Sequence, residues 1–370
     1  MSLIDKYIKG IRFLLPTPFT IAIILTLFTL LLAYFWPNVA INEDLKSTDK
    51  ITFILKAWNE GLWDAKGLAF TIQMMLMLLL GHVLAISNPI NELINKLLPL
   101  CNSNARSAFI VTFSTLILSW FNWGLGLVFG AIFCKKIIEN ASKFSIGINA
   151  GLIGAAGYSG LMIWHGGISG SALVKISELG HLMDLAPKFV KSNVPSLLDF
   201  SKTVFSRMNL VVTFILLTVL PISMYFLGKN TRVAVPKKFS EVKNEKHKTN
   251  LIGLEILDHS KYFGGFIGLL ILLFCFYLAF SHPSTSSFQF INPNFLNLSL
   301  LSMALIFHQS FLNFINAAEK AIGGTVGILI QFPLYFGIMG VVSQTGIIND
   351  LAMYFQNISN NFTYPLFTFF

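Results

Sequence analysis

Two short stretches of the sequence combine polar, aromatic and glycine residues in a way that could bind a small anion. The first is NWGLG, residues 122–126, and the second is WHGGISGS, residues 164–171. Asparagine, serine and the glycine backbone all offer hydrogen-bond donors, which a carboxylate needs for its two oxygens. The candidate binding residues of these stretches are Asn122, Trp123, Gly124, Gly126, Trp164, His165, Gly166, Gly167, Ser169, Gly170 and Ser171.

The aromatic residues of the two stretches could contact the apolar tail of the ligand or carry a proton during transport. Trp123 and Trp164 could form an apolar wall, and packing or a place at the membrane interface is the alternative. His165 could contact the substrate or carry a coupling proton, and a neutral structural histidine is the alternative. The sequence indicates no cofactor, and it leaves the coupling ion, H⁺ or Na⁺, open.

The composition indicates the setting of these stretches. The chain has 54% hydrophobic and 12% charged residues and a mean hydropathy of +0.69, which is typical of a multi-spanning membrane protein. Several uncharged stretches reach the roughly 20 residues that a spanning helix needs. The sequence therefore predicts an all-α polytopic membrane protein. Spans are expected near 18–36, 68–87, 145–177, 207–227, 263–281, 295–312 and 321–341.

Lysine and arginine are distributed unevenly between the expected loops. With a cytoplasmic N-terminus, the inner loops would hold 17 of the 26 Lys and Arg residues, as the positive-inside rule requires. This count works only if 107–134 enters and leaves the membrane on one side, because Arg106 and Lys135 flank it. The sequence predicts a re-entrant hairpin there, with Gly124 and Gly126 allowing tight turning and close approach at its tip. One long, tilted helix is the alternative.

The span 145–177 is expected to be broken. Each glycine in a helix interior costs about 1 kcal/mol relative to alanine, and glycines gather between Trp164 and Ser171. The half-helix after the break would present free N–H groups and a positive dipole end to an anion. Interrupted helices of this kind indicate the binding site of a transporter.

Two segments of the chain match each other at a constant offset of 258. Residues 70–97 align with residues 328–355, and Gln73 aligns with Gln331. By the charge distribution the two segments run in opposite directions, as an inverted repeat requires. Gln331 is therefore a further candidate for substrate binding, and interhelical hydrogen bonding is its alternative role.

The repeat divides the chain into three expected parts. These are an N-terminal half, 1–227, with the first repeat, a basic cytoplasmic linker, 228–262, and an incomplete second half, 263–370. The chain ends where the second repeat would enter its own hairpin, so we expect it to be truncated. Because the site of an inverted-repeat transporter takes contacts from both repeats, we expect this chain neither to transport nor to fold stably alone.

Four stretches carry a resemblance to a known family: VTFSTLILSWFNWGLGLVFGAIF, YSGLMIWHGGISGS, GHVLAIS and GILIQFPLYFGI. With them the sequence resembles the short-chain fatty acid transporter family, of the acetoacetate and butyrate uptake type. The resemblance implies an inner-membrane carrier of small monocarboxylates. It also implies kinship with the ion-transporter superfamily, whose members commonly work as dimers by an elevator-like motion.

Other function classes fit the sequence less well than a secondary carrier working by alternating access. An integral-membrane enzyme would cluster His, Asp or Glu at a membrane face, and the spans hold only isolated histidines. A channel and a truncated remnant that does not transport are the alternatives. The expected partners are a small carboxylate, the lipid bilayer and a second copy of the chain.

Two charged segments are expected to be loops. The basic stretch 228–250 favours lipid headgroups over nucleic acid, because it joins two spans. The stretch 43–66 mixes acidic and basic residues and is expected to be a solvated loop.

Overall fold

The computed structural model of the protein describes residues 16–37, 47–186, 193–236, 255–281, 288, 290–360 and 362–364. In these ranges the regular secondary structure is helical, and the one β-type pairing is an isolated bridge between Ile148 and Ala234. Five of the described helical stretches are long and apolar enough to cross a membrane, and Pro293–His308 is a shorter apolar helix. The prediction of an all-α polytopic membrane protein is confirmed.

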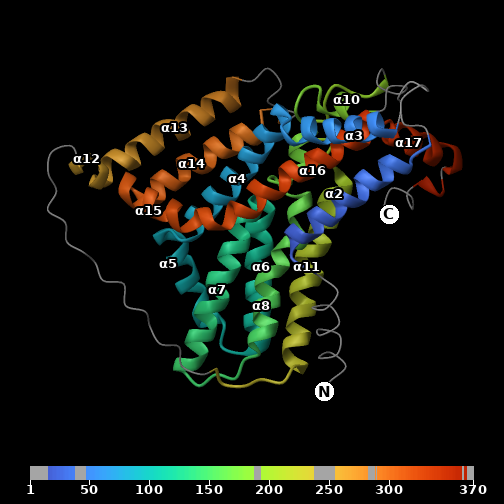
Figure 1. Ribbon diagram of the computed structural model, residues 1–370. Helices are drawn as coiled ribbons and strands as arrows, with labels where there is room; N and C mark the ends of the chain where they lie inside the picture. Colours follow the sequence, from blue (N-terminus) through green and yellow to red (C-terminus); the bar gives the residue numbers. More distant parts are fainter. Residues whose placement is uncertain are drawn as a thin grey trace. The chain divides into compact units, whose positions relative to one another are not determined.

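Helices occupy most of the predicted spans, with small differences at their ends (Figure 1). They are α2 (Pro18–Phe35), α4 (Ala65–Ala85), α11 (Arg207–Asn230), α13 (Lys261–Ser281), α14 (Pro293–His308) and α16 (Val326–Gln344). α16 begins later than the predicted residue 321 because a 3₁₀ turn, Gly323–Thr325, precedes it. Adjacent glycines disfavour an α-helix at that place. Residues 1–15 and 237–250, which include the predicted cytoplasmic N-terminus and most of the basic loop, lie outside the described residues.

The chain divides into two compact units by its internal contacts. The first unit comprises residues 1–75, 183–194 and 325–370, and the second comprises 76–182 and 195–324. Each unit combines segments that are distant in the sequence. The predicted boundaries near 227 and 262 follow the sequence repeat instead, and they stay a prediction.

In the first unit, α2 and α3 (Ser47–Leu62) pack against α16. Glycines allow the close approach of α3 to α16. A Cβ on Gly61 would lie 2.4 Å from the carbonyl oxygen of Phe336, so no larger residue fits there without a shift. At the other end of the unit, Trp36 Nε1 donates a hydrogen bond to Asp350 Oδ2 at 2.8 Å. Asp350 lies in α17 (Ile347–Ile358), which this bond links to the end of α2.

The expectation of a solvated loop at 43–66 is wrong for its described part. α3 covers residues 47–62, and the side chains of Ile54 and Ala57 are buried. The apolar residues of this stretch recur at helical spacing between the charged ones, so one face packs while the other is solvated. The high charge content obscured this pattern.

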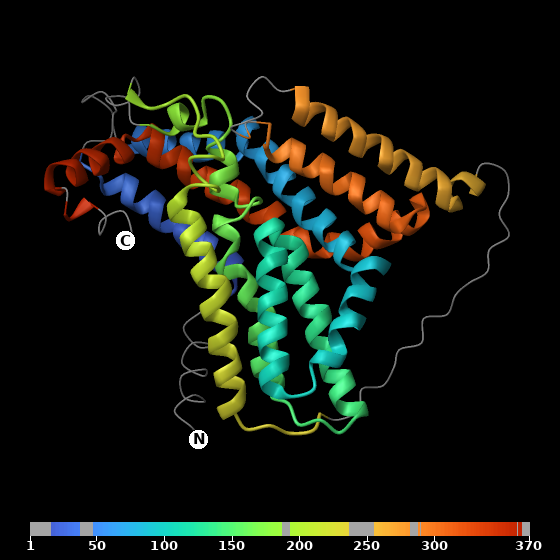
Figure 2. The ribbon, with the colours of Figure 1, turned by 180° about the vertical axis from the view of Figure 1, so that it is seen from behind.

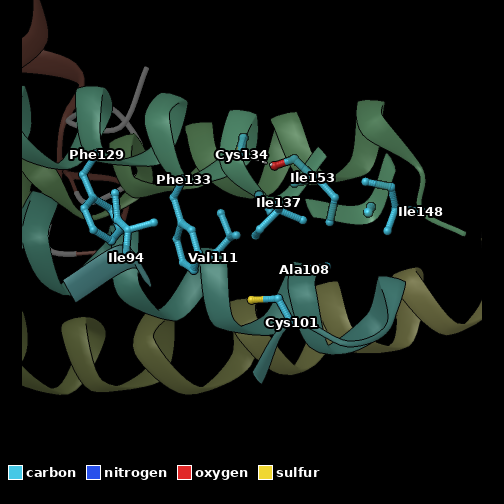
Figure 3. Close-up of a cluster of buried hydrophobic side chains, with 12 residues drawn as sticks. Ile94, Cys101, Ala108, Val111, Phe129, Phe133, Cys134, Ile137, Ile148 and Ile153 are labelled. Carbon is cyan, nitrogen blue, oxygen red and sulfur yellow. Dashed lines mark hydrogen bonds between the residues drawn. The ribbon is translucent and has the colours of Figure 1, made fainter. Parts of the chain in front are cut away.

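The second unit contains a bundle in which α6 contacts three other helices (Figures 1 and 2). The bundle consists of α6 (Asn104–Phe121), α7 (Trp123–Lys143), α8 (Ala150–Tyr158) and α11. Its buried centre includes Phe129 and Phe133 of α7, Val111 of α6 and Ile153 of α8 (Figure 3). Cys134 Sγ also donates to the Ile153 carbonyl at 3.0 Å. Since lipid tails are as apolar as these side chains, close packing rather than exclusion from water holds such a bundle together.

The remaining α-helical parts of the second unit are residues 76–85 of α4, α5 (Asn88–Leu97), α9 (Ser171–Lys175), α10 (His181–Leu185, up to residue 182), α12 (Glu255–His259), α13, α14 and α15 (Phe311–Ile322). α13 and α14 pack closely, because Gly268 leaves room for α14. Ser302 Oγ donates to the Gly268 carbonyl at 2.9 Å across this contact. His308, at the end of α14, hydrogen-bonds the carbonyl of Val83 at 2.8 Å.

Two segments share one pattern, a long helix followed after a short break by a second helix. They are α4 with α5, and α16 with α17. When residues are shifted by 258, α5 falls on 346–355, which α17 covers almost completely. This agreement supports the repeat found in the sequence, and its inverted orientation stays a prediction.

Candidate anion-binding site

Asn122 is the residue at which α6 ends and α7 begins. Its extended backbone, with φ −145° and ψ 119°, reverses the chain between the two helices, which then pack against each other. Asn122 N donates to the Leu118 carbonyl at 2.8 Å, while its Oδ1 accepts from Leu125 N at 2.7 Å. A side chain that accepts from the third residue of a helix is a favourable N-cap. One asparagine therefore closes one helix and starts the other, which gives 104–143 the form of a helical hairpin.

The two glycines of the tip do not form its turn, so that part of the prediction is wrong. Gly124 and Gly126 both lie inside α7, where they let other segments come close. A Cβ on Gly126 would lie 2.0 Å from Ser119 Oγ, and one on Gly124 would lie 3.0 Å from the Cα of Leu78. Close approach, the other predicted use of these glycines, is what the structure shows.

The segment predicted as a broken span ends its first helix earlier than expected. α8 stops at Tyr158 and is followed by two 3₁₀ turns, Ser159–Met162 and Trp164–Gly166. The glycines before the predicted break explain the difference, because they pack on the hairpin. A Cβ on Gly160 would lie 2.3 Å from Ser119 Oγ.

The half-helix after the break is too short for the role that its dipole was expected to have. α9 covers only Ser171–Lys175, and the dipole of a helix grows from the alignment of many peptide units. Among the backbone hydrogen bonds of the described residues, the N–H groups of Ser169 and Ser171 find no acceptor. Individual N–H groups are therefore the donors that this segment offers.

The tip of the hairpin and the broken segment are joined by two hydrogen bonds. Trp123 N donates to Ser169 Oγ at 3.0 Å, and Ile168 N donates to the Trp120 carbonyl at 2.8 Å. The backbones come so close that a Cβ on Gly167 would lie 2.3 Å from the Trp120 carbonyl oxygen. The structure thus brings together two stretches that the sequence analysis selected separately.

The aromatic candidates lie side by side at this junction. The rings of Trp123 and Trp164 have centroids 5.2 Å apart, and the ring of His165 lies 4.1 Å from that of Trp164. His165 is exposed, whereas both tryptophans are half-buried. The ring planes are tilted by 56° and 47°, so the three side chains form an angled aromatic cluster beside the polar groups of the tip.

Two further glycines and a residue from α11 fix the backbone of the break. A Cβ on Gly170 would lie 2.5 Å from the His165 carbonyl oxygen, so the chain folds tightly on itself. Asn209 Nδ2, in the first turn of α11, donates to the carbonyls of Gly166 at 2.8 Å and Val204 at 2.7 Å. Asn209 therefore positions the break from outside it.

Several buried polar atoms at the tip have no hydrogen-bond partner within the described part of the chain. They are Ser119 Oγ, Trp120 Nε1, Asn122 Nδ2 and Trp123 Nε1. Asn122 is 1% exposed and Ser119 is fully buried. All four groups can donate, and an unpaired buried donor costs about 1–3 kcal/mol. Because these donors have no acceptor among the described residues, the tip is a candidate site for binding an anion.

The sequence analysis missed three residues that contribute to this site: Ser119, Trp120 and Asn209. Ser119 and Trp120 stand in the same motif as Asn122, one turn before it, and the motif itself was the signal that could have found them. Asn209 lies 43 residues beyond Gly166, and nothing in its surroundings in the sequence marks it.

Gln331 belongs to the first unit, on α16, and its side chain is half-buried. Its predicted role in substrate binding stays a prediction. Within the residues that the structure describes, His, Cys, Asp and Glu form no group of three that could hold a metal ion.

Comparison with known proteins gives the family of this chain. The sequence matches the family profile described as short chain fatty acid transporter over residues 3–370. It is 29% identical over 362 residues to an Escherichia coli (strain K12) protein named "Putative short-chain fatty acid transporter". The alignment covers 96% of this chain and 76% of that protein. A Haemophilus influenzae protein of the same name is 28% identical over 368 residues, with the same coverage of 96% and 76%. No solved structure matches the chain. Because the profile covers nearly the whole sequence, the protein belongs to the short chain fatty acid transporter family, a family of membrane transporters and not of enzymes.

Proposed function

We propose that the protein is a secondary carrier that moves short-chain fatty acids, such as butyrate or acetoacetate, across the inner membrane by alternating access. The observation that carries this proposal is the set of unpaired, buried donors at the hairpin tip, beside a pair of tryptophans. Family membership supports the substrate class. The interrupted segments on both sides of the site are typical of secondary carriers.

The carboxylate of the substrate would accept from the tip of the hairpin and from the break. Asn122 Nδ2 and Ser119 Oγ are the buried donors from the first, and the backbone N–H groups of buried Ser169 and partly buried Ser171 are the donors from the second. Uncharged donors suit a carrier, because they hold an anion without the tight ion pair that a lysine or arginine would make. Weaker binding of this kind also lets the substrate leave the site on the other side of the membrane.

The tail of the substrate would lie against Trp123 and Trp164. Their rings offer a small apolar surface, 5.2 Å between centroids, which suits a chain of few carbons. His165, which contacts Trp164 and is exposed, is the group of this site that we propose for coupling to a proton. Sodium coupling is the alternative.

The arrangement in the membrane follows from the distribution of charge. We propose a cytoplasmic N-terminus, because the inner loops then hold 17 of the 26 Lys and Arg residues. We also propose that the carrier works as a homodimer, in line with the family resemblance.

Uptake by the purified chain in liposomes tests this proposal. The proposal predicts saturable uptake of labelled butyrate or acetoacetate, above that of empty vesicles, and faster uptake when the vesicles are preloaded with unlabelled substrate. The expectation that this chain does not transport alone predicts no uptake, so the measurement decides between the two. Acceleration by internal substrate is a property of a carrier and not of a channel. Uptake that rises linearly with concentration and ignores preloading would favour the channel, and no uptake would refute the proposed function.

A further inference from the structure

A groove lies between α6 and α11 on the second unit, away from the hairpin tip. Its volume is about 510 Å³, and its walls are apolar apart from one arginine and one tyrosine. The walls include Leu100, Phe109, Ile110, Ile222 and Phe226. Leu100, Ile222 and Phe226 are each about half exposed, so the groove opens to the surroundings of the protein.

Arg106 lines one end of this groove and carries an unneutralised charge. Its Nη1 donates to Asn102 Oδ1 at 3.3 Å, and within the described part of the chain it has no carboxylate partner. The side chain is exposed. A guanidinium has five N–H donors in a fork that fits a phosphate, so most of them are available to a ligand.

Two further cations lie at the same end of the helix pair. Asn104 Nδ2 donates to the Gly228 carbonyl at 2.7 Å, which holds the start of α6 against the end of α11. Asn149 links the start of α6 to the segment after α11. Its N donates to Asn104 Oδ1 at 2.8 Å, and its Nδ2 donates to the Arg232 carbonyl at 3.0 Å. These bonds bring Lys229 and Arg232, both exposed, to the end of the groove that Arg106 occupies.

We propose that this groove binds one anionic phospholipid. The phosphate would lie on Arg106, and an acyl chain would follow the apolar wall from Phe109 to Ile222. The predicted topology places this end of α6 at the cytoplasmic surface, where the anionic lipids of a membrane gather and attract basic side chains. The site does not depend on the proposed transport function.

A lipid fits this groove better than a second copy of the chain. Two copies related by a two-fold axis through the groove would bring their positive ends near each other, which opposes association. An acyl chain suits an apolar groove of about 510 Å³, and the lipid headgroup supplies the missing negative charge. Charge complementarity therefore selects the lipid.

Native mass spectrometry of the full chain, released from bilayers of phosphatidylglycerol and phosphatidylcholine with identical acyl chains, tests the proposal. We expect the bound lipid to be enriched in phosphatidylglycerol by roughly fivefold, the effect of one basic residue near an anionic surface. Arg106→Gln should abolish this enrichment. Arg207→Gln, the same change at an exposed residue at the other end of α11, should preserve it.

A second pair of variants tests the apolar wall. Ile110→Trp fills the groove and should remove the bound lipid, whereas Ile117→Trp, on an exposed part of α6 outside the groove, should retain it. This pair decides the matter even where Arg106→Gln cannot be isolated in a folded form. The proposal is overturned if phosphatidylglycerol is not enriched, if Ile110→Trp binds as much lipid as the parent, or if the chain is released as a lipid-free dimer that a cysteine at position 222 cross-links to its copy.

Discussion

The backbone N–H of Trp123 donates a hydrogen bond to Ser169 Oγ at 3.0 Å, across 46 residues of sequence. Trp123 begins the second helix of the hairpin, and Ser169 lies inside the break that follows α8. Ser169 is 1% exposed and Trp123 is half-buried, so this bond is partly shielded from water. The hairpin tip and the break are therefore fixed to each other, and the site proposed for the carboxylate depends on both.

Ser169→Ala should lower butyrate uptake and the thermal stability of the protein together. The change removes the acceptor of a buried N–H, which costs on the order of 1–3 kcal/mol. Uptake in liposomes and the midpoint of thermal unfolding in detergent measure the two effects.

Ser299→Ala is the matched control. Among the described residues, the Ser299 hydroxyl donates only to the carbonyl of Phe295 in its own helix, at 2.9 Å, so both measurements should stay near those of the parent. Equal uptake and equal unfolding midpoints for the two variants would show that the bond between Trp123 and Ser169 contributes neither to stability nor to transport.

Asn122→Asp separates the two functions of this residue. An aspartate keeps an oxygen that can cap α7 at Leu125 N, but it replaces the unpaired Nδ2 donor by a negative oxygen. The cap of α7 should persist, while the added charge repels a carboxylate, so uptake should fall by at least about tenfold. Because Asn122 is 1% exposed, the buried charge should also lower the unfolding temperature.

The control for this variant is Asn292→Asp, which makes the same change at another N-cap. Asn292 Oδ1 accepts from Phe295 N at 3.0 Å at the start of α14. Its uptake should match that of the parent. Full uptake by Asn122→Asp would move the carboxylate away from the hairpin tip.

The long helices and the hairpin could be predicted from the sequence, and the contacts that complete the site could not. An uncharged run limits where a span can lie, and α11 indeed begins at Arg207, as predicted. α3 was missed because charged residues interrupt its apolar face. Asn209 could not be found because its bond to Gly166 depends on the packing of α11, which no local pattern encodes.

Gly126→Ala should destabilise the bundle of the second unit. The new Cβ would lie 2.0 Å from Ser119 Oγ and 2.6 Å from Ser119 N, so the backbone of α6 would have to move away from α7. Overpacking of this kind costs about 1–3 kcal/mol. A lower midpoint of thermal unfolding is the expected result.

Gly154→Ala provides the comparison within the same bundle. Nothing lies within 4 Å of a Cβ at Gly154, and alanine favours a helix over glycine by about 1 kcal/mol. This variant should be as stable as the parent or more stable. If both glycine variants unfolded at the same temperature, the close approach of α6 and α7 at Gly126 would not matter for stability.

The native cysteines should react very slowly with maleimides, which makes the chain suitable for labelling. All three, Cys101, Cys134 and Cys275, are buried. Burial raises the pKa of the Cys101 thiol to about 12. Because the thiolate is the reactive form and is scarce at pH values well below this pKa, the reaction of Cys101 should be slow at pH 7 and should speed up as the pH rises. Labelling of the unmodified protein at pH 7, 8 and 9 measures this background.

With that background, single added cysteines can decide the topology of the hairpin. Asn102 lies just before α6, and Lys135 lies within α7 directly after residue 134; both side chains are exposed. If 107–134 enters and leaves the membrane on one side, Asn102→Cys and Lys135→Cys should both react with an impermeant maleimide only from the cytoplasmic face, in inside-out vesicles. Labelling from opposite faces would mean that the segment crosses the membrane, which would place Asn122 at a different depth and remove the basis for joining it to Ser169 in one site.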